Sequence, residues 1–211
     1  MARPHTALLD HTRIVKAALA LVDETGDFTV PALARSLGVQ AASIYHHVDG
    51  RAGIIELLRA HLAAGMDYTP LETRPWADGL AAFARSYRKA FAAHPRLVPL
   101  LTTSTVRAPL VIEAYERMAV LLDDGGFRPQ DALSVLTAVE NLIIGAALDL
   151  AALEVMWEIP EGVDAPALAR ALAAAPPGPQ RADRAFEIGL CALLTGVAQF
   201  LDAGHDGISG P

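Results

Sequence analysis

The 211-residue chain has a single cysteine and few aromatic residues, which make up 6% of the sequence. One cysteine, Cys191, cannot form a disulfide within the chain, and a lone thiol in an apolar stretch suits the reducing cytoplasm. Runs of β-branched residues typical of strands are short, whereas alanine and leucine supply much of the 53% hydrophobic content. Because both favour helices, the composition predicts an all-α protein built of packed helices.

Segments typical of export or membrane insertion are also missing. The N-terminus shows no basic region followed by an apolar one, as a signal peptide would. The longest apolar stretch, from Leu142 to Val155, is interrupted by Asp149 and Glu154, so it is too short and too charged to cross a bilayer. The sequence therefore predicts a soluble, cytoplasmic protein with no membrane partner.

Motifs that would indicate catalysis or a bound metal do not occur. The chain contains no G-x-S-x-G, no Walker loop, no G-x-G-x-x-G and no H-E-x-x-H. His46 and His47 are adjacent, so on a helix their side chains point about 100° apart and cannot share a metal. The other histidines are scattered. We expect no enzyme activity, no cofactor and no metal site, although a metal sensor stays open as an alternative.

The charge of the chain is unevenly distributed. The net charge is −7, yet residues 1–65 carry six basic and six acidic side chains, while residues 66–211 carry eleven basic and eighteen acidic ones. All of the negative excess thus lies in the C-terminal part. A neutral N-terminal part predicts modest non-specific affinity for DNA and dependence on a few well-placed contacts.

Apolar periodicity and capping residues predict the helices and divide the chain into two domains. Asp10 and Thr29 are suitable N-caps, and Gly26 and Gly38 are placed to end the helices that follow them. Two prolines in residues 68–75 indicate a connector, which predicts domains 1–66 and 67–211. The expected helices cover 11–25, 30–37, 51–66, 76–94, 109–124, 129–157 and 182–203, with short helices at 41–47 and in 95–108 and 158–180.

The segment from Phe28 to His47, FTVPALARSLGVQAASIYHH, has the pattern of a helix-turn-helix. Gly38 supplies the tight turn, Val39 fills the angle between the helices, and Ile44 gives the second helix one apolar contact with the core. The other faces of that helix are polar or small, as a helix that reads base edges in the major groove requires. Spacing alone also fits an ordinary corner of a helix bundle.

The segment LARSLGVQAASIYHHVDGRAGIIELL resembles the signature of the tetracycline-repressor family. The resemblance implies a DNA-binding three-helix domain, connected to the rest by the helix 51–66. It departs from the family pattern at Ala41 and Ala42, so the operator sequence does not carry over. The implied base-reading residues are Gln40, Ala41, Ser43 and His46, and the implied phosphate contacts are Thr29, Tyr45, His47 and Arg51.

The resemblance continues in PLETRPWADGLAAFARSYRKAFAAHPRLV, in GGFRPQDALSVLTAVENLIIGAALD and, more loosely, in DRAFEIGLCALLTGV. It implies a homodimer held by the last two long helices. The last of these has an apolar stripe, with Gly189 and Gly196 beside it to allow close approach of a partner. A stripe of this kind also suits the domain's own core. Its residues are Phe186, Leu190, Leu193, Leu194, Val197 and Leu201.

The resemblance also implies a cavity for a small-molecule effector. Family members coordinate a drug-bound magnesium partly through a histidine and a glutamate, and near those positions this chain has Leu101 and Asp149. Losing the imidazole makes that wall apolar, so the expected effector is mostly apolar and is not magnesium-tetracycline. The implied cavity lining is Phe83, Tyr87, Leu101, Thr105, Tyr115, Met118, Leu133, Leu136 and Asp149.

Together these features predict a transcriptional repressor that binds a palindromic operator in double-stranded DNA and is released by its effector. The alternative is a helical dimer that binds a small molecule or a metal without specific DNA binding, which the near-neutral charge of residues 1–65 supports.

Overall fold

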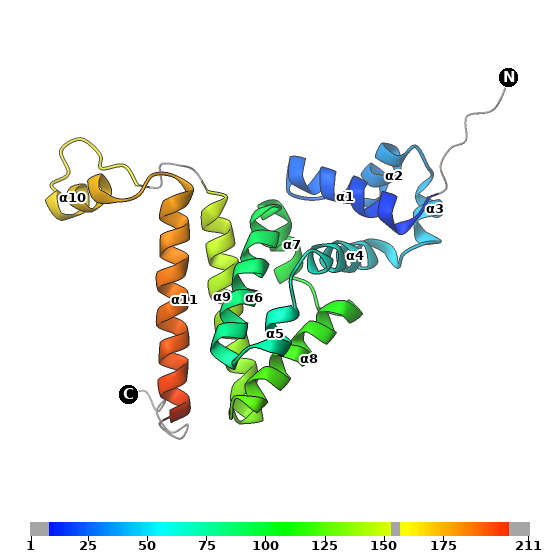
Figure 1. Cartoon of the computed structure of the whole chain (residues 1–211). Helices are drawn as coiled ribbons and strands as arrows, with labels where there is room; N and C mark the ends of the chain where they lie inside the picture. Colours follow the sequence, from blue (N-terminus) through cyan, green and yellow to red (C-terminus); the bar gives the residue numbers. More distant parts are fainter. Residues whose placement is uncertain (1–8, 153–156, 203–211) are drawn as a thin grey trace. The chain divides into compact units, whose positions relative to one another are not determined.

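The computed structural model describes residues 9–152 and 157–202, and in these ranges it contains helices and no strands (Figure 1). The expected all-α fold is thereby confirmed. Contacts between residues divide the chain into two compact units. The N-terminal unit comprises residues 9–66 and 94–116, and the C-terminal unit comprises 67–93, 117–152 and 157–202. The segment 94–116 thus belongs, by its contacts, with the first 66 residues.

The N-terminal unit contains the expected helix-turn-helix and the helices that support it. Residues 94–116 add two short helices and the first half of a longer one. The helices are α1 (His11–Thr25), α2 (Val30–Leu37), α3 (Ala41–Tyr45), α4 (Gly50–Ala64), the 3₁₀ helix η1 (Pro95–Leu97), α7 (Val98–Thr102) and α8 (Pro109–Asp124).

Capping residues set the ends of α1 and α2 as the sequence predicts. The Asp10 carboxylate accepts a hydrogen bond from the Arg13 amide at 2.8 Å, and the Thr29 hydroxyl accepts one from the Ala32 amide at 3.2 Å. Both bonds satisfy backbone donors that have no partner within the helix. Gly26 and Gly38 follow the two helices with φ of 83° and 69°, the left-handed conformation that glycine adopts without steric cost.

The N-terminal unit has its own hydrophobic core, in which α1 packs against both α2 and α4. Each of the four helices α1 to α4 contributes at least one side chain with no exposed surface, and α3 contributes Ile44 alone. The short helix α3 is therefore held by one apolar anchor, and most of its other side chains are left outside the core. The fully buried members from the four helices are Ile14, Val22, Leu33, Ile44, Ile54 and Leu58.

The connector differs from the sequence-based expectation, because residues 69–73 form a short helix, α5 (Thr69–Thr73). Pro70 lies in its first turn, where the missing N–H has no helical partner to lose. The prolines of this segment indicate a break in the sequence, but one of them starts a helix. Pro70 and Leu71 are buried and α5 packs on α6 (Trp76–Ala92), so the connector belongs to the C-terminal unit.

The C-terminal unit is built around α6, α9 (Pro129–Leu150) and α11 (Pro179–Asp202), which pack side by side (Figure 1). A shorter helix, α10 (Pro166–Ala174), has no buried residue. α9 ends at Leu150, before the expected end at residue 157, and residues 153–156 lie outside the described ranges. The core of this unit includes Leu80, Phe83, Leu122, Val139, Ile143, Phe186 and Leu190.

Two helices of this unit are unusually apolar for their degree of burial. α9 and α11 are long and apolar enough to cross a membrane by length and composition, yet only 28% and 11% of their most apolar windows are buried. An ion pair joins the two helices: Arg181 on α11 binds Asp149 on α9 at 2.6 Å. The apolar surface that remains exposed on these helices is therefore a feature that the function must explain.

Candidate nucleic-acid interface and effector site

The side chains around α3 form an exposed polar surface. Gln40, Tyr45, His46 and His47 are exposed, Tyr45 by 57%, while Ala41 and Ser43 are half-buried. The single fully buried residue of the helix, Ile44, faces the opposite way into the core. The helix is shorter than expected, because His46 and His47 lie in the turn after it. The expected base-reading residues are thus brought together on one short element.

Contacts from α1 fix the end of this element. The His11 Nε2 donates a hydrogen bond to the His47 carbonyl at 2.9 Å, and the two imidazole rings meet edge to face with centroids 6.3 Å apart. The next residue, Val48, is only 9% exposed. The backbone after α3 is therefore held to α1, and the imidazole of His47 is left exposed for a ligand.

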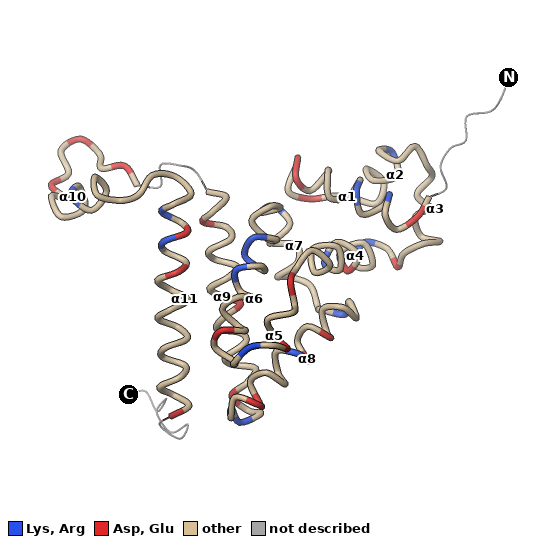
Figure 2. Tube along the Cα trace, in the orientation of Figure 1, with Lys and Arg blue, Asp and Glu red and all other residues tan. Residues whose placement is uncertain are grey.

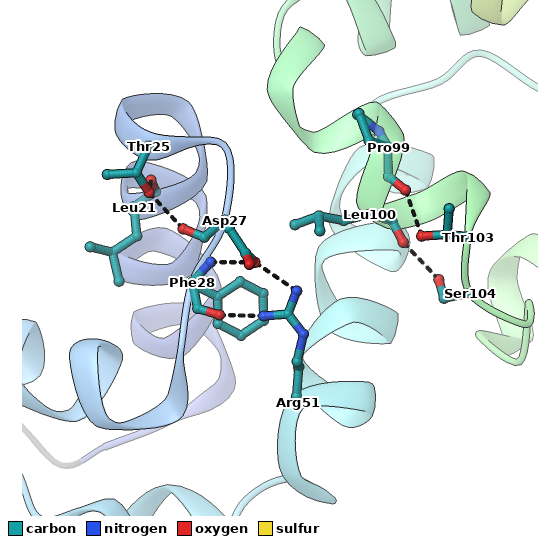
Figure 3. Close-up of polar contacts among 9 residues, drawn as sticks. All are labelled: Leu21, Thr25, Asp27, Phe28, Arg51, Pro99, Leu100, Thr103 and Ser104. Carbon is teal, nitrogen blue, oxygen red and sulfur yellow. Dashed lines mark hydrogen bonds and ion pairs between the residues drawn. The ribbon is translucent and has the colours of Figure 1, made fainter.

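Arg51 does not extend freely from the start of α4, as a phosphate contact implied by the resemblance would. Its guanidinium donates hydrogen bonds to the Phe28 carbonyl and, at 2.6 Å, to the Asp27 carboxylate, and it stacks over the Phe28 ring at 4.5 Å (Figure 3). It joins α4 to the loop that precedes α2. Its side chain stays 40% exposed, so the outer edge of the cation remains accessible.

The contact with Arg51 makes the contribution of Asp27 to the stability of the protein depend on pH. The hydrogen bond from Arg51, followed by the one from the Phe28 amide, holds the pKa of the Asp27 carboxyl below its ordinary value. A depressed folded-state pKa stabilises the protein above the unfolded-state pKa, near 4, and that stability is lost as the pH falls through the folded-state value.

We expect Asp27→Asn to lower the free energy of unfolding by about 0.2–1 kcal/mol at pH 7, since the pair is solvent-exposed. The difference from wild type should be smaller at pH 2, because the wild-type Asp27 carboxyl loses its charge as the pH falls through its depressed folded-state pKa. Urea unfolding at the two pH values measures it. A difference of equal size at both would show that the ion pair is not its source.

Charge around the interface is sparse (Figure 2). Helix α3 has no lysine, arginine, aspartate or glutamate. A basic residue that the sequence did not single out, Arg35, lies exposed in the last turn of α2, and its carbonyl accepts a hydrogen bond from the Gly38 amide in the turn. In the sequence, Arg35 could have been identified as a candidate DNA contact by its position one turn before Gly38. The exposed surface at α3 is therefore polar and carries none of these four charged residues.

In the C-terminal unit, α6 carries three rings of an aromatic row that begins at Tyr68, the residue before α5. Tyr68, Phe83, Tyr87 and Phe91 follow one another in tilted or edge-to-face contacts, with centroids 5.5, 5.8 and 4.6 Å apart. The Tyr87 hydroxyl donates to Glu140 on α9 at 3.3 Å. Burial raises the pKa of the Tyr68 hydroxyl, so it stays a neutral donor. Phe83 and Phe91 are buried in the core, so the row combines apolar rings with the hydroxyls of Tyr68 and Tyr87.

The nine expected effector residues do not all lie in one environment. Phe83, Met118 and Leu136 are buried in the C-terminal unit, whereas Leu133 is 69% exposed. Tyr87 and Asp149 are partly buried there, and both carry polar contacts. Leu101, Thr105 and Tyr115 belong to the N-terminal unit, where Leu101 is buried, Thr105 exposed and Tyr115 intermediate. A separate groove of about 590 Å³ between α1 and α4 contains none of the nine.

A polar cluster that sequence reasoning missed joins α4 to the segment after α7. Arg59, only 9% exposed, binds Glu56 and the carbonyls of Leu101 and Ser104. The two carbonyl partners of Arg59 lie more than 40 positions along the chain, so no local pattern indicates them.

The comparison with known families decides where this chain belongs. Residues 69–201 match the model described as the tetracyclin repressor-like C-terminal domain. The chain belongs to the tetracycline-repressor family. The match covers α5 through most of α11, so it includes the long apolar helices and also the segment 94–116, which belongs by its contacts to the N-terminal unit.

Individual relatives in the tetracycline-repressor family agree. A helix-turn-helix-type transcriptional regulator of Saccharopolyspora erythraea is 30% identical over 142 residues, which are 66% of this chain and 60% of that protein. The class E tetracycline repressor of Escherichia coli is 30% identical over 140 residues, 64% of this chain and 66% of the repressor. The matches thus span less than two thirds of either relative.

A solved structure of the tetracycline-repressor family covers more of the chain. ActR of Streptomyces coelicolor, in complex with actinorhodin, superimposes with a TM-score of 0.72 at 25% identity, over 97% of this chain and 100% of ActR. The similarity includes both the helix-turn-helix and the C-terminal unit.

The expected dimer stripe divides between two environments in the structure. Phe186 and Leu190 are buried in the chain's own core, where Phe186 lies under the guanidinium of Arg88 at 4.7 Å. Leu193, Leu194, Val197 and Leu201 are half-buried. Gly189 faces the chain's own α9, because a Cβ there would come within 2.9 Å of Leu142.

Proposed function

We propose that this chain is a homodimeric transcriptional repressor that binds a palindromic operator and is released from it by a small, mostly apolar effector. The supporting observation is the α2–turn–α3 element, whose one apolar anchor leaves a polar surface exposed, in a member of the tetracycline-repressor family. The protein acts in the cytoplasm, without catalysing a reaction and without a cofactor.

The exposed residues at α3 contact the DNA. Gln40 presents an amide that pairs with adenine, Ser43 and His46 reach neighbouring base edges, and half-buried Ala41 meets a thymine methyl. Phosphates are bound by Tyr45, His47, Thr29 and Arg35. Arg51 contributes the exposed edge of its guanidinium, while its contact with Asp27 fixes the loop before α2.

The exposed faces of α9 and α11 form the dimer interface. α11 is free of charge from residue 188 to 201, and Figure 2 shows this as an unbroken tan stretch. Ile188 is 59% exposed there, and Leu148 on α9 is 42% exposed. A Cβ at Gly145 or Gly196 would meet no described atom within 4 Å, so both allow a second helix to approach closely. Burial of this surface in a symmetric dimer removes it from water.

The effector binds beside the aromatic row of α6. Leu101 is an apolar, buried side chain near the position where the family has a metal-binding histidine, and Asp149 is occupied by Arg181 through two contacts of 2.6 and 3.2 Å. Among the described residues, no three histidine, cysteine, aspartate or glutamate side chains group as a metal site. A structure of the relative ActR is a complex with actinorhodin.

We expect purified protein to show no saturable, magnesium-dependent binding of tetracycline, because neither Leu101 nor the paired Asp149 offers the metal a free ligand. Tetracycline fluorescence titrated with protein, with and without magnesium, measures this. A saturable increase that requires magnesium would refute the assignment of a mostly apolar effector.

Release follows from two states of the dimer that the effector binds with different affinity. In one state the two α3 helices are spaced for the operator, about one helical turn of DNA apart. Effector binding changes the position of α4, which carries Arg51 at its start, and with it the spacing. The effector therefore lowers the affinity of the dimer for DNA without contacting the DNA.

The proposal is tested by selecting duplexes from a random DNA pool with the full-length protein. An enriched inverted repeat, with half-site centres about 10 base pairs or a multiple apart, supports a symmetric dimer. Enrichment of no sequence would favour the alternative, a helical dimer without specific DNA binding, for which the near-neutral charge of residues 1–65 provides a reason.

A further inference from the structure

The polar cluster between α4 and residues 101–107 has an unusual degree of burial for charged groups. Arg59 and Glu56, one turn apart on α4, have side chains only 10% and 21% exposed, and their Nε and Oε1 atoms lie 3.0 Å apart. Placing a guanidinium in such a site is unfavourable unless its donors find acceptors. The structure supplies these acceptors from the segment after α7, within the same unit.

The contacts of Arg59 fall on the backbone where α7 ends. Its Nη2 lies 2.9 Å from the Leu101 carbonyl, 3.2 Å from the Ser104 carbonyl and 2.6 Å from the Ser104 hydroxyl, so its two N–H groups are shared among three acceptors. The last carbonyls of a helix lack partners within it, and Arg59 provides one. The Ser104 hydroxyl also donates to the Leu100 carbonyl at 3.0 Å, which further fixes this turn (Figure 3).

Glu56 holds the other end of the same segment. Its Oε2 accepts a hydrogen bond from the Arg107 amide at 2.6 Å, while Oε1 binds Arg59. The pair therefore attaches to residues 101–107 at both ends. These bonds depend on backbone positions, so a shift of the segment breaks them whatever its side chains do.

This segment and the DNA-binding element are both attached to α4. Arg51, at the helix start, binds Asp27 and Phe28 ahead of α2, and Arg59 follows eight residues later, about 12 Å along the helix axis. Leu101 is itself bound by Arg59, and Thr105 lies between Ser104, bound by Arg59, and Arg107, bound by Glu56. Leu101 and Thr105 are two of the residues expected to contact the effector.

We propose that the Glu56–Arg59 pair is the coupling contact through which a shift of residues 101–107 reaches the recognition helix. This rests on the proposed function, and it identifies the residues that regulate it. An effector that displaces the segment removes the carbonyl acceptors from Arg59, and α4 is then free to move. Because coupling is reciprocal, DNA bound at α3 must in turn stabilise residues 101–107.

Reciprocity allows a test that needs no effector. Hydrogen exchange is measured by mass spectrometry on peptides spanning 101–108, with and without a duplex selected from the random pool. In the wild-type dimer, DNA should slow exchange in these peptides by about 5-fold or more, the low end of ordinary coupling energies. In Arg59→Gln the slowing should fall below about 2-fold, although the variant still binds the duplex.

Two further variants separate coupling from loss of fold. Glu56→Gln keeps an acceptor for the Arg107 amide but removes the carboxylate that pairs with Arg59. It should therefore also lose the response, and it provides the test if Arg59→Gln does not fold. Arg85→Gln breaks an exposed pair with Glu187 in the other unit, 2.6 Å apart, and should keep the full response. Circular dichroism and melting temperature report the folding of each variant.

The outcomes distinguish the two levels of the account. The coupling is overturned, and the proposed function stands, if wild type binds the duplex but exchange in 101–108 does not change. The same conclusion follows if DNA slows this exchange in Glu56→Gln and Arg59→Gln as much as in wild type. If wild type binds no selected duplex, the proposed function fails and the coupling fails with it. Loss of the response in both variants, with Arg85→Gln unaffected, supports the proposal.

Discussion

The double variant Gln40→Ala, Tyr45→Ala is expected to bind the operator at least about 100-fold more weakly than wild type while folding normally. Both side chains are exposed, Tyr45 by 57%, and neither has a partner in the hydrophobic core. Loss of a bidentate base contact costs about 1–3 kcal/mol per site. A dimer loses that contact twice, and the missing phosphate contact adds to it.

The two single variants distinguish a contact with a base from a contact with a phosphate. Gln40→Ala should lower the preference for one base in each half-site, whereas Tyr45→Ala should weaken binding to all sequences to a similar degree. Fluorescence anisotropy with the selected duplex and with single-base variants of it measures both effects. Gln130→Ala, an exposed glutamine at the start of α9, is the matched control. Unchanged affinity in the double variant would show that α3 is not the DNA-reading element.

Ile188→Asp is expected to convert the dimer to monomers and to reduce operator affinity by more than about 100-fold. The side chain is 59% exposed in one protomer, so the fold of that protomer does not depend on it. In the proposed interface it becomes buried, and a buried unpaired carboxylate costs several kcal/mol. A monomer reads only one half-site and loses the advantage of binding two linked sites.

A second exposed isoleucine provides the control. Ile112 on α8 is 50% exposed, and Ile112→Asp should leave the protein dimeric with unchanged affinity. Sedimentation velocity, followed by DNA titration of each variant, measures the two effects. A dimeric Ile188→Asp variant with normal operator binding would exclude the exposed face of α11 from the interface.

Local chemistry allowed much of the fold to be predicted from sequence. Asp10 and Thr29 are N-caps and Gly26 and Gly38 end their helices, because these roles depend only on residues within one turn. The same reasoning was wrong in the connector, where Pro70 starts a helix. Proline is compatible with the first turn of a helix as well as with a break, and the burial that decides between them is a tertiary property.

Contacts between distant residues were beyond local reasoning. Arg51 could be placed at the start of α4, but its binding to Asp27 and Phe28 depends on how two helices pack. Apolar periodicity located a stripe on α11, yet it could not show that Phe186 and Leu190 face the chain's own core while Ile188 stays exposed. Periodicity shows that a helix has an apolar face and does not show what covers it.

We would first titrate the purified protein against the DNA that flanks its own coding region, over a salt series. This measurement shows whether the chain is a dimeric repressor that binds an operator. A dimeric repressor should bind one palindrome tightly, with two protomers per site, and its affinity should fall as salt rises. Weak binding that is equal for all fragments would contradict this expectation, and would leave a helical dimer without an operator.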